Sequence, residues 1–258
     1  MRCDLLIKIL KYDFEEDIEL LVIGDVHIGD KDCNINMVEN TIKYIKNNKN
    51  CYCFLNGDLL NMALKSSVSF EYETTSPHSE YTKLVELLEP IKDKILGVTL
   101  GNHDDRLLKE SGIDIISFMC KDLDITDVYC KYQALLLIRI RTEKRSQTHK
   151  IFITHGIGGG GRMIGSKANF LSKLTGIIGN ANCYVINHTH TPLHYTDCIY
   201  YVDSKHSDLR ENIRHFINQP AFLSYGGYGQ RLNLNPCSNY QYLIELSNKK
   251  ITVKELII

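Results

Sequence analysis

Five short polar motifs follow one another along this chain, and their side chains are of types that bind metal ions. In sequence order they are Gly24-Asp25-Val26-His27, Gly57-Asp58, Gly101-Asn102-His103-Asp104, His155-Gly156 and His188-Thr189-His190. Carboxylate, imidazole and amide groups can together coordinate divalent cations. Any one motif is weak evidence, because Gly-Asp turns are common. Five in one chain predict a centre that holds two metal ions side by side.

Each of these motifs comes directly after an apolar run that is typical of a buried strand. In the first half, strands are predicted at 19–23, 51–55 and 95–100, separated by helices at 36–48 and 79–93. This β-α-β-α-β order indicates parallel strands joined by right-handed crossovers. Because ligands bind at the carboxyl ends of such strands, we expect the motifs to meet there.

The second half of the chain is richer in predicted strands and has one predicted helix, at 166–176. The strands predicted there fall at 134–140, 151–154, 184–186, 199–202, 221–224, 240–245 and 251–256. We therefore expect an α/β fold of two packed mixed sheets with helices outside. No linker or low-complexity tract interrupts the sequence, so a single domain over residues 1–258 is expected.

The spacing of the motif residues suggests how two metal ions would be shared. Asp25 and His27 are two residues apart, so an extended segment would point both side chains the same way. The carboxylate of Asp58 has two oxygens and could bridge both ions. Besides Asp58, the first ion would take Asp25, His27 and His190, and the second would take Asn102, His155 and His188.

This mixture of ligands also narrows the metal and the chemistry. Imidazole, carboxylate and amide together favour Mn, Fe, Zn, Ni or Co over Ca or Mg, and Mn²⁺ is the cofactor that we expect first. Asp25 and Asp58 offset only part of the charge of two divalent ions, so the site should attract phosphate oxyanions. Two ions about 3.5–4 Å apart can lower the pKa of a water between them, and the hydroxide formed could attack a phosphate ester.

A proton donor for the leaving group is also needed, and His103 is the candidate. It adjoins the predicted ligand Asn102, so its side chain should point another way, and we assign it as general acid or stabiliser of the leaving group. Asp104 or Asp105 could orient it. Arg106 could contact substrate phosphate, or form an ion pair with a nearby acid.

As a set, the five motifs resemble those of the calcineurin-like metallophosphoesterase family. The family pattern is GDxH, GD, GNH(D/E), H and GHxH, which stands here as GDVH, GD, GNHD, THG and NHTH over residues 24–190. The resemblance implies a four-layer α-β-β-α sandwich, the two-metal ligand set given above, and His103 as proton donor. One departure from the pattern is Asn187, which occupies the usual position of a glycine.

Two further segments resemble parts of phage-type and prophage members of that family. The stretch 61–81 is similar to their insert, which should lie on the substrate side and makes His78 a candidate substrate contact. The glycine-rich loop after His155 gives Arg162 the same candidate role. Within that loop Gly165-Ser166-Lys167 has the reverse of the P-loop order, so an NTP-binding P-loop is not expected.

Composition argues against several other classes of protein. The net charge of −1 does not indicate a broad basic surface that would bind duplex nucleic acid. No apolar stretch approaches the roughly 18–20 residues that would span a membrane. Nine scattered cysteines without a Cys-x-x-Cys motif favour a reducing, cytoplasmic location over a disulfide framework.

The sequence therefore favours a binuclear metal-dependent phosphoesterase, with three hypotheses open. The first is a phosphodiesterase or nuclease acting on nucleotides or nucleic acid. It is favoured because 59–63 contain no arginine, which protein phosphatases usually carry shortly after their second motif. The second is a phosphomonoesterase or protein phosphatase. The third is a non-catalytic binding scaffold of the same fold. The sequence does not indicate an oligomeric state.

Overall fold

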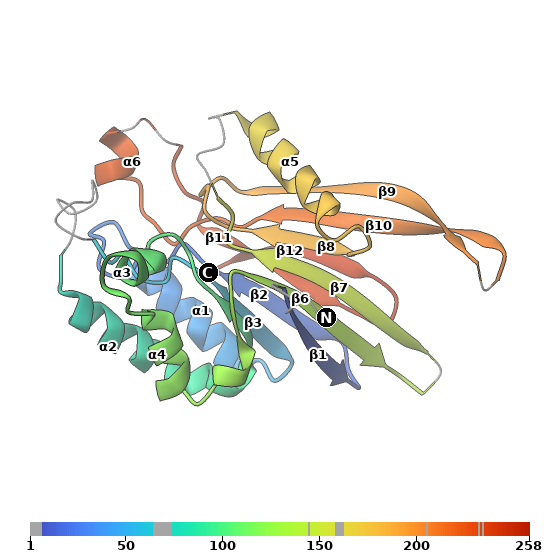
Figure 1. Ribbon diagram of the computed structural model, residues 1–258, viewed down its shortest axis with the longest axis horizontal. Helices are drawn as coiled ribbons and strands as arrows, with labels where there is room; N and C mark the ends of the chain where they lie inside the picture. Colours follow the sequence, from blue (N-terminus) through green and yellow to red (C-terminus); the bar gives the residue numbers. More distant parts are fainter. Residues whose placement is uncertain are drawn as a thin grey trace.

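Two six-stranded mixed β-sheets pack face to face, with helices on both outer surfaces (Figure 1). The computed structural model describes residues 7–63, 74–143, 145–157, 163–204, 206–231, 233 and 235–258, and for Tyr228 the backbone alone. The predicted α/β fold of two mixed sheets is confirmed.

The first sheet contains the three strands predicted for the first half of the chain. In spatial order its strands are β12 (Ile251–Ile257), β11 (Tyr240–Leu246), β2 (Ile18–Ile23), β3 (Cys51–Asn56), β4 (Ile95–Thr99) and β5 (Tyr129–Lys131). From β2 to β5 all neighbours are parallel, whereas β11 and β12 are antiparallel additions at one edge. The carboxyl ends of β2, β3 and β4 therefore lie at the same edge of the sheet.

The helices that follow these strands cover the outer face of the first sheet. They are α1 (Ile35–Asn47), α2 (Pro77–Leu88), α3 (Asp104–Ser111) and α4 (Ile115–Asp122). Helix α1 begins where the side chain of Asn34 accepts a hydrogen bond from the Met37 amide at 3.2 Å. Its apolar face, which includes Ile42 and Ile45, packs in the same buried cluster as Leu55 of β3.

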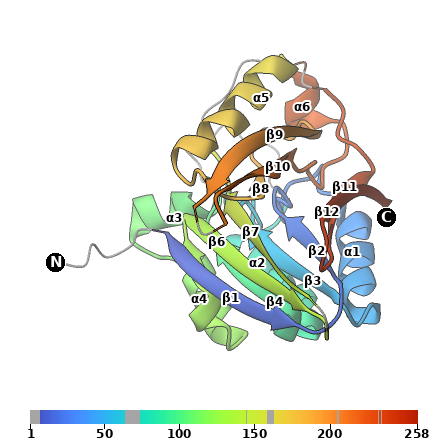
Figure 2. The same cartoon turned by 90° about the vertical axis from the view of Figure 1, so that its right-hand side faces the viewer.

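The second sheet carries the remaining motifs. In spatial order its strands are β1 (Lys8–Phe14), β6 (Gln133–Arg141), β7 (Ser146–Thr154), β8 (Cys183–Ile186), β10 (Asp208–Asn218) and β9 (Leu193–Asp203). Strands β7 and β8 are parallel, so their carboxyl ends also coincide. Helix α5 (Ile164–Lys173) covers the outer face of this sheet (Figure 2) and packs through Leu171 against Phe152 and Tyr184.

The interior between the two sheets is apolar. Phe54 and Val22 of the first sheet belong to the same buried cluster as Ile151 and Val185 of the second. The sheets and their outer helices therefore form four layers in the order α-β-β-α. This arrangement fixes the relative positions of the motif loops, since all five leave the sandwich at strand ends on one side of the molecule.

Several predicted elements differ from those observed. No strand forms at 221–224, where the backbone makes only an isolated bridge between Cys33 and Leu223. The helix predicted at 79–93 is α helical only to Leu88 and continues as a 3₁₀ helix over Glu89–Lys94, because Pro90 lacks an amide hydrogen. Strands β1, β5 and β10 and helices α3, α4 and α6 (Gly227–Arg231) were not predicted.

The predicted substrate-side insert at 61–81 is described only in part. Residues 61–63 are buried, 64–73 lie outside the described residues, and α2 begins at Pro77 after the capping side chain of Ser76. Within the described residues, no helix is both long enough and apolar enough to cross a lipid bilayer.

Candidate metal centre

All five polar motifs lie at the carboxyl ends of strands, as expected. Asp25 and His27 follow β2, Asp58 follows β3, and His103 follows β4. From the second sheet, His155 comes directly after β7, and His188 and His190 come after β8. The two sheets thus contribute to a single site.

The backbone at this site is held in an uncommon conformation. Positive φ angles occur at Asp25 (51°), His27 (52°), Asp58 (49°), His188 (69°) and His190 (54°). Such angles are unusual for residues other than glycine and persist only where the surroundings impose them, often at functional sites. The expectation of an extended segment at Asp25 and His27 is wrong, since both residues have left-handed backbone.

Two glycines allow the motif loops of β3 and β4 to touch. Gly57 has a φ of 75°, and a Cβ at this position would lie 2.3 Å from the amide nitrogen of Gly101. A Cβ on Gly101 would in turn lie 2.1 Å from Oδ1 of Asp58. Both distances are too short for any side chain, so the glycines are required for the carboxylate of Asp58 to sit against the neighbouring loop.

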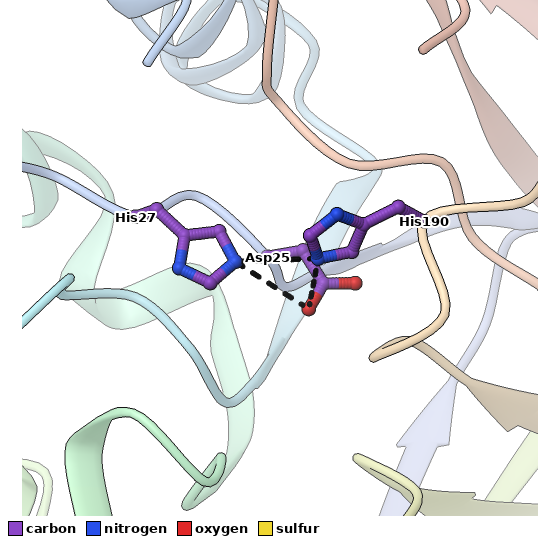
Figure 3. Close-up of side chains that lie close together, drawn as sticks. All are labelled: Asp25, His27 and His190. Atoms are coloured by element: carbon purple, nitrogen blue, oxygen red, sulfur yellow. Dashed lines mark hydrogen bonds and ion pairs between the residues drawn. The ribbon is translucent and has the colours of Figure 1, made fainter. Parts of the chain in front are cut away.

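Asp25, His27 and His190 form the first group of ligand-type side chains, and they point toward one another (Figure 3). Oδ1 of Asp25 lies 3.5 Å from Nε2 of His190 and 4.0 Å from Nε2 of His27. The two imidazole Nε2 atoms are 3.3 Å apart. The other oxygen of Asp25 accepts a hydrogen bond from the backbone amide of His188 at 2.7 Å, which fixes the orientation of the carboxylate.

Asp58, His155 and His188 form the second group. Oδ2 of Asp58 lies 3.3 Å from Nε2 of His155. Nδ1 of His155 lies 2.7 Å from the backbone oxygen of Asn56, to which it must donate a hydrogen. Such a contact is typical of metal-binding histidines, because it fixes the tautomer and turns the other nitrogen toward the ion.

Asp58 connects the two groups. Its Oδ2 lies 4.0 Å from Nε2 of His27, which belongs to the first group, and 4.0 Å from Nε2 of His103. Its Oδ1 accepts the backbone amide of His103 at 2.7 Å. One carboxylate oxygen therefore faces histidines of both groups, while the other is held by the backbone amide of His103, and the bridging role of Asp58 stays a prediction.

The donor atoms of the site fit divalent cations. Asp25 and Asp58 are almost fully buried, at 0% and 2% exposure. Oδ1 of Asp25 and Nε2 of His155 are both buried without a hydrogen-bond partner, although both face the cluster. Buried polar atoms of this kind are costly to the fold unless something compensates them. Divalent ions held by these two groups of side chains would do so.

We expect Mn²⁺ binding at this site to release protons. Burial disfavours the charged form of His155, but Asp58 and Asp25 outweigh it and raise the pKa of His155 to about 10. The proton held at neutral pH must leave before Nε2 can coordinate a cation. Affinity of the metal-free protein for Mn²⁺ should therefore rise between about pH 6 and about pH 8.

Calorimetric titration with Mn²⁺ in two buffers of different ionisation enthalpy would measure this release. His206→Ala removes an exposed histidine paired with Asp203 far along the chain, and should leave the proton count unchanged. Binding enthalpies that do not depend on the buffer would contradict the expectation.

His103 lies beside the two groups and is held by residues other than those predicted. Its Nδ1 lies 3.0 Å from the backbone oxygen and 3.2 Å from the side-chain oxygen of Asn61, and Arg106 Nη2 donates to its Nε2 at 2.9 Å. This pattern requires a neutral ring with its hydrogen on Nδ1. Burial and the charge of Arg106 lower the pKa of His103, while Asp58 acts in the opposite direction.

Asp104 does not orient His103 in this structure. Its Oδ1 accepts from the amide of Leu60 and its Oδ2 from the amide of Gly101, both at 3.1 Å. Burial and the neighbouring Asp58 raise the pKa of Asp104 to about 7. Asp104 therefore connects the loops after β3 and β4, and Asn61 takes the orienting position. The neighbouring Asp105 forms an ion pair with Lys109.

The remaining predicted site residues are less closely tied to the cluster. Asn102 is exposed at the turn between β4 and α3, so its role as a ligand stays a prediction. His78 is exposed at the second position of α2. Arg162 lies outside the described residues. Asn61 was not predicted, because its contact with His103 joins two loops that are 42 residues apart in the sequence.

Comparison with known proteins agrees with this arrangement. The family model described as calcineurin-like phosphoesterase matches residues 18–226, which is well over half of the chain and includes all five motifs. A search of curated proteins finds no match to the sequence.

Proposed function

Because the chain belongs to the calcineurin-like phosphoesterase family, we propose that it is an active phosphoesterase that holds two divalent ions, with Mn²⁺ the first candidate. We propose further that its substrates are phosphodiesters of nucleotides or nucleic acid. The observation that carries the proposal is the position of Asp58, whose Oδ2 faces His155 at 3.3 Å and His27 at 4.0 Å.

The side chains of this site would have different roles in hydrolysis. When bound, the two ions would supply charge neutralisation at the phosphate oxygens and a water of lowered pKa. Asp25 and Asp58 supply the negative charge that holds cations in a buried site. His155 is kept in its binding orientation by the backbone oxygen of Asn56.

His103 and Arg106 are proposed to act on the substrate. His103 is neutral with its hydrogen on Nδ1 in the structure, so it would first take up a proton from water on Nε2 when substrate displaces Arg106, and would then pass that proton to the leaving oxygen. In the structure Arg106 contacts that same Nε2, so its guanidinium lies close enough to the candidate proton donor to bind a phosphate oxygen when substrate displaces this contact.

The preference for diesters rests on the segment that follows Asp58. Leu59, Leu60 and Met62 are buried, at 1%, 0% and 0% exposure, and Asn61 contacts His103. This segment therefore offers no cation to the additional charge of a phosphomonoester. The phosphomonoesterase is the second candidate, with Arg106 as the residue that favours it.

A non-catalytic scaffold is the third candidate. A protein that only bound partners would have no need for strained backbone and buried polar atoms without hydrogen bonds at one point. Five predicted ligands nevertheless have positive φ, and Oδ1 of Asp25 is buried without a hydrogen-bond partner. The described cysteines are all free thiols, which favours a reducing compartment such as the cytoplasm.

Relative turnover of two model substrates tests the proposal. Metal-stripped protein reconstituted with Mn²⁺ should hydrolyse bis-p-nitrophenyl phosphate faster than p-nitrophenyl phosphate at equal concentration. Single-stranded DNA, RNA and cyclic nucleotides would then be compared as natural-type substrates. Faster hydrolysis of the monoester would favour the phosphomonoesterase, and no turnover of any ester by the metal-loaded protein would favour the scaffold.

A further inference from the structure

Two buried asparagines join the two sheets directly behind the candidate metal centre. Asn56 is the last residue of β3 in the first sheet, and Asn187 follows β8 in the second. Nδ2 of Asn56 donates to Oδ1 of Asn187 at 2.7 Å and to the backbone oxygen of Thr154, at the end of β7, at 3.0 Å. Both asparagines have 0% exposure.

The side-chain oxygen of Asn56 is also hydrogen-bonded. The hydroxyl of Thr99, the last residue of β4, donates to Oδ1 of Asn56 at 2.8 Å. One side chain thus connects β3, β4, β7 and the loop after β8. These are the elements from which Asp58, His155 and His188 extend.

Each partner in this network stands next to a predicted ligand. Thr154 precedes His155, and Asn187 precedes His188. The backbone oxygen of Asn56 accepts the Nδ1 hydrogen of His155 at 2.7 Å. The backbone N–H of Asn187 donates to the backbone oxygen of His155 at 3.1 Å. A shift of either asparagine would therefore move ligands of the second group directly.

The pair also determines the space available to the first group. A Cβ on Gly24 would lie 2.7 Å from Cγ and Nδ2 of Asn187 and 2.8 Å from the backbone oxygen of Asn56. Gly24 immediately precedes Asp25, so the motif after β2 packs without clearance against the asparagine pair. The pair touches the loops of both ligand groups.

Stability of the fold alone does not explain Asn187. Its Nδ2 is buried without a hydrogen-bond partner, and an unpartnered buried donor is a cost that a smaller apolar residue would avoid. The side chain of Asn187 instead accepts a hydrogen bond from Asn56 and so connects the two sheets beside the predicted ligands.

We infer that Asn56 and Asn187 form a positioning pair that sets the separation between the two halves of the metal centre through the bond from Asn56 Nδ2 to Asn187 Oδ1. This inference rests on the proposed metal centre. It assigns a role to Asn187, which stands where the family pattern has glycine. Neither asparagine contacts the reacting atoms, so their effect on hydrolysis is indirect.

The test is a double-mutant cycle in which Mn²⁺ affinity of the full-length protein is measured by calorimetry. Asn56→Ala and Asn187→Ala should each weaken Mn²⁺ binding by about tenfold or more, which is the usual effect of losing a residue that orients metal ligands. The double variant should bind no more weakly than the weaker single variant, because both substitutions remove the same bond.

A second asparagine pair provides the matched control. Nδ2 of Asn182 donates to Oδ1 of Asn212 at 2.7 Å, at the amino end of β8 rather than its carboxyl end. Asn182→Ala should leave Mn²⁺ affinity unchanged even if the melting temperature of the metal-free protein falls.

A conservative substitution keeps the test informative if an alanine variant does not fold. Asn187→Asp retains an oxygen that can accept from Asn56 and exchanges the unpartnered donor for a second acceptor, so it should bind Mn²⁺ more tightly than Asn187→Ala. If folded Asn56→Ala and Asn187→Ala bind Mn²⁺ with the affinity of the parent protein, the inference is wrong but the proposed metal centre stands. The same holds if folded Asn187→Asp binds Mn²⁺ no more tightly than Asn187→Ala. No Mn²⁺ binding by the parent protein would overturn the proposed metal centre and this inference with it.

Discussion

Asp58→Asn should reduce hydrolysis of bis-p-nitrophenyl phosphate by roughly 10³-fold or more and lower the number of bound Mn²⁺ ions per chain from two. The substitution keeps the size of the side chain and removes only its charge. In the structure Oδ2 of Asp58 lies 3.3 Å from Nε2 of His155 and 4.0 Å from Nε2 of His27, so its charge faces histidines of both ligand groups.

Loss of activity must be separated from loss of folding. Metal analysis and thermal unfolding of the metal-free protein would do this, since removing the charge of Asp58 from between the buried carboxylates of Asp25 and Asp104 should not unfold the chain. Asp105→Asn is a suitable control, because Asp105 forms an ion pair with Lys109 on α3 and lies outside both ligand groups. Full activity of Asp58→Asn with two ions bound would contradict the proposed catalytic centre.

His103→Ala should reduce turnover without removing either metal ion. Donation of a proton to a leaving group is worth about 10²–10⁴-fold in rate, and the effect should depend on the ester. An alkoxide leaving group needs the proton, whereas p-nitrophenolate leaves readily without it. The loss should therefore be larger for a nucleotide diester than for bis-p-nitrophenyl phosphate.

The structure makes this comparison specific to one atom. Nδ1 of His103 is bound by Asn61, so only Nε2 can reach a substrate, and that atom lies 4.0 Å from Oδ2 of Asp58. His206→Ala is the control for the general loss of a histidine. Equal losses on both types of ester would argue that His103 has a structural or binding role and is not the proton donor.

Much of the fold followed from the distribution of apolar residues. The apolar runs at β2, β3 and β4 are continuous, and these strands are buried on both faces. Each run is followed by a glycine-containing polar motif, which indicated where the strand ends. The position of the site then followed from the rule that parallel strands bring their carboxyl ends together.

Elements with weaker local signals were missed for identifiable reasons. In β1 Leu10, Tyr12 and Phe14 alternate with polar residues, which was a usable signal for a strand. Strand β10 begins with a polar stretch because its first half pairs only with β9 in an exposed hairpin. Helix α4 has a capping residue, Asp114, but is too short for a clear period.

Contacts between loops could not be predicted from one sequence. The positive φ angles of Asp25 and Asp58 depend on the meeting of loops from different strands, and the assignment of Asn61 to His103 depends on a contact across 42 residues. Asn187 was recognised as a departure from the family pattern, but its bond to Asn56 across the two sheets requires the folded structure.

The most direct test of the central claim is the dependence of hydrolysis on the number of bound ions. Metal-stripped protein would be titrated with Mn²⁺ while bound metal and turnover of bis-p-nitrophenyl phosphate are measured on the same samples. We predict no turnover without metal and a rise to full activity as the second ion binds. Turnover that is unaffected by removing the metal would contradict the account, and so would two bound ions with no hydrolysis of this diester, DNA, RNA or cyclic nucleotides.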